Sequence, residues 1–136
     1  MASTASPAVA SATSPVRVIK PEQRTQQTAQ TPGIVREEAL SAPGAWVGLA
    51  GTAPGITSGW HHHGDYDSYL FVRAGRLRME FGPGGQEVCE AEAGDFLHVP
   101  RGAVHRESNP GPEEQVVVVV RVGAGAPVVN VDGPPA

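Results

Sequence analysis

The sequence predicts an all-β fold, an antiparallel sandwich or barrel built around one core. The first observation is length, because 136 residues are the size of a single domain. The second is composition, since 17 glycines and 13 prolines argue against a helical bundle. The third is spacing: from Gly33 onward, short apolar runs are separated by Gly and Pro at intervals of roughly 8 to 12 residues, which is typical of short strands joined by turns.

The apolar runs suit a small jelly roll. They occupy residues 34–40, 46–50, 69–72, 77–81, 87–90, 96–99, 116–122 and 128–131. Residues 76–81 alternate between charged and apolar side chains, so this strand is expected to be half buried, with Leu77, Met79 and Phe81 on its inner face. The five valines at 116–120 predict either a strand covered on both faces or an edge strand protected by an oligomer partner, and a homodimer is the simplest cover.

Residues 1–18 differ in composition from the rest of the chain. They are rich in Ala, Ser, Thr and Pro and would bury little apolar surface, so we expect a disordered arm followed by one domain at 19–136. No signal-peptide pattern and no apolar stretch of about 20 residues is present, which predicts no membrane partner. The single cysteine, Cys89, closes no intramolecular disulfide, so a cytoplasmic location is expected.

The charge balance argues against a nucleic-acid partner. Ten basic and fourteen acidic side chains give a net charge of -4, and the sequence contains no run of Lys and Arg that would follow a phosphate backbone. A small molecule is the expected partner.

Three consecutive histidines, at 61–63, lie in an expected extended segment. Alternate residues of a strand share a face, so His61 and His63 point the same way and His62 points away. His105 is the best candidate for a third ligand, because the turn at 100–102 would redirect the chain towards the pair. Three neutral imidazoles that leave other positions open describe a catalytic type of metal site rather than a closed structural one.

The same residues resemble the two motifs of the cupin family. The first motif reads Gly, five residues, His-x-His, three or four residues, Glu, six residues, Gly, and the matching residues here are Gly55, His61, His63 and Gly75. The second reads Gly, five residues, Pro-x-Gly, two residues, His, three residues, Asn, and every position is matched, by Gly94, Pro100, Gly102, His105 and Asn109. The motifs span 55–75 and 94–109. The resemblance implies a small single-domain cupin, a jelly-roll β-barrel with a three-His divalent metal site in its mouth, and commonly a homodimer.

The carboxylate of the first motif is displaced or absent. The position separated from Gly75 by six residues is Ser68, a poor metal ligand, whereas Asp67 fits the shorter three-residue spacer. Two alternatives follow: Asp67 reaches the metal directly or through water, or three histidines bind it with Asp67 or Asp65 beside them. A site with only histidine ligands is cationic, which favours anionic groups on the substrate.

The candidates for catalytic residues are Asp67, Glu107 and Tyr69. Glu107 shares its strand parity with His105 and could act as a general acid or base, although a solvated carboxylate at the rim is the simpler expectation. Tyr69 could donate to a ligand, but a tyrosine near a turn usually packs with its hydroxyl in water. His98 is expected to be a hydrogen-bonded structural histidine, and the arginines, Arg121 among them, to be mostly surface residues.

These observations predict an enzyme that acts on a small molecule at one divalent metal ion. Three-His cupins include thiol and diketone dioxygenases, so the resemblance favours an iron(II)-dependent dioxygenase. Zinc, nickel or manganese at the same ligands would instead favour a metal-dependent isomerase, lyase or hydrolase. A non-catalytic cupin that binds a small ligand is the remaining alternative.

Overall fold

The computed structural model describes residues 15–136. The arm expected at residues 1–18 falls mostly outside this range, and residues 15–18 are exposed and carry no secondary structure. Within the described range, no helix has the length and apolar character needed to span a membrane.

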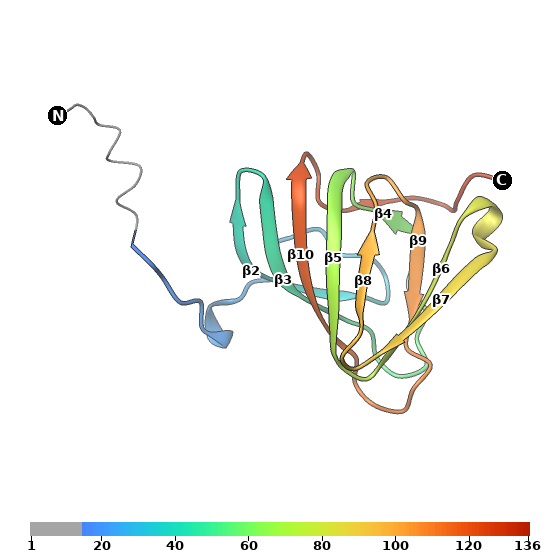
Figure 1. Ribbon diagram of the computed structural model, residues 1–136, viewed down its shortest axis with the longest axis horizontal. Helices are drawn as coiled ribbons and strands as arrows, with labels where there is room; N and C mark the ends of the chain where they lie inside the picture. The colour runs from blue at the N-terminus through green and yellow to red at the C-terminus, as the bar shows by residue number, and fades with distance from the viewer. Residues whose placement is uncertain (1–14) are drawn as a thin grey trace.

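Two five-stranded antiparallel sheets pack face to face (Figure 1). The first sheet contains, in spatial order, β2 (Val35–Ala42), β3 (Ala45–Gly51), β10 (Val116–Ala124), β5 (Asp65–Ala74) and β8 (Phe96–Val99). The second contains β11 (Val129–Asn130), β4 (His61–His62), β9 (His105–Ser108), β6 (Arg76–Phe81) and β7 (Glu87–Glu92). Two short 3-10 helices, η2 (Pro21–Gln23) and η3 (Pro83–Gly85), lie outside the sheets. The all-β jelly-roll prediction is confirmed.

The two sheets form a sandwich and not a closed barrel, because no ladder joins the named strands of one sheet to those of the other. The chain passes between them at sharp corners. Gly75, the last residue of the first cupin-like motif, connects β5 to β6 with φ +77°, and a Cβ there would lie 2.6 Å from the backbone oxygen of Glu114. Only glycine fits this corner without strain.

The core fills the space between the sheets. It consists of Trp46, Leu70, Val72, Leu77, Met79, Ala91, Val99, Val117 and Val119. Leu77 and Met79 therefore face inward as predicted, while Phe81 is half buried. The valine-rich strand β10 is hydrogen-bonded to β3 on one side and to β5 on the other, so the interpretation of it as an edge strand is wrong.

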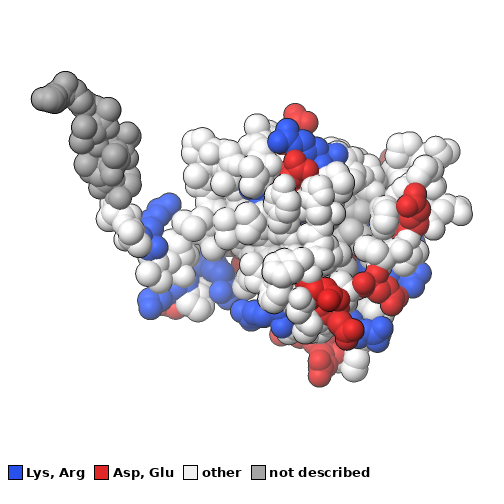
Figure 2. All heavy atoms as spheres, viewed as in Figure 1, with Lys and Arg blue, Asp and Glu red and all other residues white. Residues whose placement is uncertain are grey.

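Part of the outer side of the first sheet is apolar. We call it the apolar face and define it by four exposed side chains, Tyr69, Phe96, Val120 and Val122. Figure 2 shows the same region, over β10, β5 and β8, as mostly uncharged surface, with the acidic and basic side chains gathered near its margins. A patch of this kind is typical of an interaction surface.

Candidate metal centre

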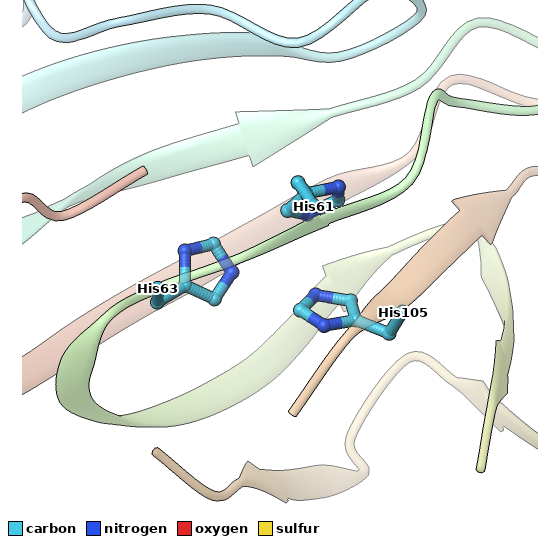
Figure 3. A group of neighbouring side chains, drawn as sticks. All are labelled: His61, His63 and His105. Atoms are coloured by element: carbon cyan, nitrogen blue, oxygen red, sulfur yellow. The ribbon is translucent and has the colours of Figure 1, made fainter. Parts of the chain in front are cut away.

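Three histidines meet in the interior between the two sheets (Figure 3). His61 lies on β4, His63 follows that strand directly, and His105 begins β9. One ring nitrogen of each lies within 4.8 Å of the others, and the three residues are at most 3% exposed. The structure thus brings together the three residues that the sequence predicted, although in the interior and not in an open mouth.

Strand register and two tight turns place the rings. His61 and His105 are direct partners across β4 and β9, so their side chains share a face and the ring centroids lie 4.3 Å apart. Gly64 adopts φ +57° immediately after His63, where a Cβ would lie 2.8 Å from the Ala126 oxygen. The Gly102 amide donates to the Gly64 oxygen at 2.9 Å, which fastens the turn before His105 to the turn after His63.

The backbone fixes the tautomer of all three imidazoles. Each Nδ1 lies within hydrogen-bonding distance of a carbonyl oxygen: His61 of Gly59 (3.0 Å), His63 of Pro127 (2.8 Å) and His105 of Ala103 (2.8 Å). A carbonyl oxygen only accepts, so each Nδ1 carries the proton and each Nε2 presents a lone pair. Histidines that bind metals are held in this way.

Glu107 lies beside two of the three histidines. Glu107 is only 8% exposed, and its Oε2 lies 3.3 Å from His61 Nε2 and 3.4 Å from His105 Nε2. Both nitrogens are buried and have no hydrogen-bond partner in the described chain. Lone pairs that face a carboxylate repel it unless a cation lies between them. Neighbouring ligands on a first-row ion with bonds of about 2.1 Å stand roughly 3.0–3.4 Å apart, so these distances suit a bound metal.

The protonation equilibria favour a metal over a proton as that cation. Burial lowers the pKa of His61, although nearby Glu107 opposes the shift, and burial lowers the pKa of His63 still further. Burial raises the pKa of Glu107, but the close approach of the His105 and His61 imidazoles outweighs that effect and holds the pKa well below the ordinary value. The neutral histidines and the charged carboxylate are the forms that bind divalent ions.

The position of Glu107 overturns the expectation of a solvated carboxylate at the rim. The side chain is buried because β9 carries it on the same inward face as His105, two residues earlier. In the sequence, the shared parity of Glu107 and His105 had already indicated an inward side chain. The alternating burial along β9 confirms that orientation.

Asp67 is not brought to the histidines. It lies on the outer side of β5, where its carboxylate accepts bonds from Arg101 at 2.9 Å and from His98 at 3.0 Å. The bond from Arg101 is the main reason that the pKa of Asp67 is lowered. Tyr69 shares that outer side, is 49% exposed and stacks on His98, with ring centroids 5.1 Å apart. Neither residue contacts the cluster in the structure.

The inward neighbour of Asp67 is Ser68, which is fully buried. Its Oγ accepts a hydrogen bond from Arg121 at 2.7 Å. The carboxylate of the first motif is therefore missing from the interior, and Glu107 on β9 supplies a carboxylate there from the other sheet.

Sequence reasoning missed two interior arginines. Arg36 is 1% exposed and Arg121 3%, and both line one cavity with His63, His105 and Glu107. Burial, followed by the neighbouring charge of Arg36, lowers the pKa of Arg121 to about 9. The expectation that Arg121 lies at the surface is wrong.

A signal for each arginine was present in the strand alternation. Arg121 follows Val117 and Val119 at intervals of two on β10, and Arg36 follows the buried Ile34 by the same interval.

The cavity is small and otherwise apolar. Its remaining walls are Ile34, Ala50, Leu70, Val99, Val117 and Val119. The volume open to the centre of a water molecule is about 10 Å³, about what one water needs, so any larger ligand beside the histidines requires side chains to move.

Comparison with known proteins agrees with the fold. The model of the Cupin domain family matches residues 48–121, more than half of the chain. The uncharacterized protein YdbB of Bacillus subtilis is 40% identical over 47 residues, which are 35% of this chain and 40% of that protein. The chain thus matches well under half the length of this curated relative.

Solved structures show the same fold. An uncharacterized conserved protein with a double-stranded β-helix domain from Klebsiella pneumoniae superimposes with a TM-score of 0.67 and 22% identity, over 86% of this chain and 98% of that one. Bacillus subtilis oxalate decarboxylase, a protein described with Mn(II) centres, gives a TM-score of 0.65 and 22% identity over 78% of this chain and 30% of its own. The family match, the two motifs and the convergent histidines agree, and the chain belongs to the Cupin domain family.

Proposed function

We propose that this protein is a metal-dependent enzyme that transforms a small molecule at one divalent ion held by His61, His63 and His105, with Glu107 as a fourth ligand. The observation that carries the proposal is the pair of buried, unpaired Nε2 atoms of His61 and His105, which face one carboxylate oxygen. A polar cluster without an intervening cation would be costly to bury.

Iron(II) is the favoured metal and a dioxygenase the favoured class. Imidazole nitrogen suits iron, and a mixed nitrogen and carboxylate set with open positions is characteristic of non-haem iron oxygenases. Bound iron(II) would supply the means to activate dioxygen. The chain's own contribution is to orient the ligands through the backbone carbonyls and to exclude bulk water with the apolar walls.

A second candidate is a manganese-dependent lyase or isomerase. Manganese accepts the same donors, with the carboxylate of Glu107 as the harder ligand. The specific support is the likeness in fold to oxalate decarboxylase, a protein described with Mn(II) centres. Zinc and nickel are also compatible with imidazole ligands.

The first experiment is elemental analysis of protein purified anaerobically without an affinity tag. About one iron per chain, retained in His98→Ala and lost in His61→Ala and His105→Ala, would support the iron enzyme. His98 is a matched control because it is exposed and pairs with Asp67 on the outer side. Manganese at that stoichiometry would favour the second candidate. Wild-type protein that folds but takes up no divalent ion would overturn both.

A second step separates catalysis from simple binding. Nitric oxide added to iron-loaded protein would give a paramagnetic complex if ligand positions are open, and oxygen consumption with a panel of small molecules would then identify turnover. Iron that neither binds nitric oxide nor supports oxygen uptake would instead indicate the non-catalytic alternative, in which the metal braces the fold.

A further inference from the structure

We propose that Arg36 and Arg121 form an anion clamp that binds the carboxylate group of a short-chain substrate beside the metal. The proposal deepens the proposed function, since it names the substrate class of the same site. Binding of the substrate beside the metal rests on the metal centre, but the arginine pair itself is independent of any metal.

The two guanidinium groups have unused hydrogen-bonding capacity. Arg121 donates to Ser68 Oγ at 2.7 Å and lies 5.2 Å from the centre of the Trp46 ring. Arg36 donates to Thr31 Oγ1 at 2.8 Å and approaches the Ala29 oxygen at 3.4 Å. The Nε atoms of both arginines are buried without an acceptor among residues 15–136. A guanidinium has five N–H donors, so each retains donors for a ligand.

Among the described residues, neither arginine forms a close ion pair, although the charge of Glu107 acts on both at longer range. Within the described chain, no carboxylate oxygen lies within 4.0 Å of Arg36 or Arg121, whereas the surface residues Arg24, Arg101 and Arg106 all form ion pairs. A buried charge normally requires a partner, because its transfer out of water costs several kcal/mol. Neutral hydroxyls orient these two arginines without compensating their charge.

The net charge of the cavity also favours an anionic ligand. The two arginines are positive, and Glu107 is the single carboxylate that lines the cavity with them. A divalent ion on the histidines would add two further positive charges. An anionic ligand is the simplest means of reducing this excess in a site shielded from solvent.

A carboxylate matches the two arginines better than other anions do. Its planar pair of oxygens matches the planar fork of a guanidinium, and one oxygen remains free to approach a metal. The free volume is about that of one water molecule, so a short carboxylic acid enters only as side chains move apart, and a phosphate ester or an aromatic acid would require a larger rearrangement. The walls formed by Leu70, Val99 and Val119 suit a short hydrocarbon part.

The test compares acetate with acetamide, which has nearly the same shape but no charge. Calorimetric titration of metal-loaded wild-type protein should give a dissociation constant for acetate at least about tenfold below that for acetamide, a difference of about 1.4 kcal/mol. Arg36→Gln and Arg121→Gln should each raise the acetate constant at least about tenfold while metal content stays at the wild-type value. Arg101→Gln is the matched control, because Arg101 is exposed and pairs with Asp67.

The outcomes separate this proposal from the metal centre. If no metal binds, the same titration of metal-free protein still tests the clamp, because the two positive arginines outnumber the single negative charge of Glu107. Acetate that binds no more tightly than acetamide to wild-type protein, in either form, would overturn the clamp even if a glutamine variant failed to fold. Folded glutamine variants that retain wild-type acetate affinity would also overturn it.

Discussion

His61 and His105 stand directly opposite each other on neighbouring strands, with their rings 4.3 Å apart and both Nε2 atoms buried without a hydrogen-bond partner in the described chain. Cross-strand pairing sets this relationship, because partners in an antiparallel ladder project from the same face. Each motif of the sequence supplies one member of the pair. The metal site thus depends on the register between β4 and β9.

Substitution of Glu107 tests its role as a ligand. Glu107→Gln preserves the shape of the side chain but removes the charge beside His61 and His105, so we expect the affinity for a divalent ion to fall by about 10- to 100-fold. Titration of metal-free protein with Mn²⁺ or Zn²⁺ measures it. Asp67→Asn is the matched control and should leave metal affinity unchanged, because that carboxylate is bonded to Arg101 and His98. Equal affinities in the two variants would contradict the assignment.

The stability of the metal-free protein should fall as the solution is acidified below about pH 6.5. Burial lowers the pKa of His61 and His63 in the folded chain, whereas both take up a proton on unfolding below their ordinary pKa of 6.5. The unfolded state then binds more protons, so acid favours unfolding, by up to about 1.4 kcal/mol per pH unit for each histidine. Glu107, whose pKa is also lowered, adds to the loss only below about 4.5.

Urea denaturation of metal-free protein at pH 5, 6, 7 and 8 checks this dependence. His98→Ala is the control, because this exposed histidine lies outside the cluster. A free energy of unfolding that is constant between pH 7 and pH 5 would show that the buried histidines do not control it.

Gly75→Ala should destabilise the fold more than Gly102→Ala. Both glycines have positive φ, +77° and +70°, and so share a backbone penalty of about 1–2 kcal/mol for any other residue. Only at Gly75 would the new Cβ meet the Glu114 oxygen, at 2.6 Å, whereas it would meet nothing within 4 Å at Gly102. We expect an additional loss of about 1–3 kcal/mol at Gly75, measured by denaturant unfolding. Equal losses would mean that the backbone around Gly75 moves to accommodate the added Cβ.

A homodimer is expected to form through the apolar face. Val120, on the central strand β10, is 36% exposed, and Val120→Lys would place a charge in the middle of that face. Sedimentation equilibrium should show a wild-type dimer and a folded monomer for the variant. Val88→Lys on β7 of the other sheet is the control, because Val88 is similarly exposed. A monomeric wild-type protein, or a dimer broken equally by both substitutions, would refute this interface.

Much of the fold and the metal ligands could be predicted from the sequence, because both depend on local patterns. Gly and Pro spacing marks the turns, and the parity of His61 and His63 places both on one face. The second motif fixes His105 by its distance from the turn at 100–102.

Alternation alone could not show that the carboxylate and the arginines meet in one site, because that depends on how the two sheets face each other. Asp67 and Ser68 are adjacent, and only the direction of β5 decides that Ser68 points inward. Arg121 has the parity of its buried valines, although a charged side chain is costly to bury.

The hydrogen bond between His63 Nδ1 and the Pro127 oxygen joins residues 64 positions apart. Contacts of such long range form late in folding, because the intervening chain must first be ordered. We therefore expect a metal ion to bind after the C-terminal segment has docked, and not during the early steps of folding. Bound metal should accordingly slow unfolding while leaving the folding rate nearly unchanged.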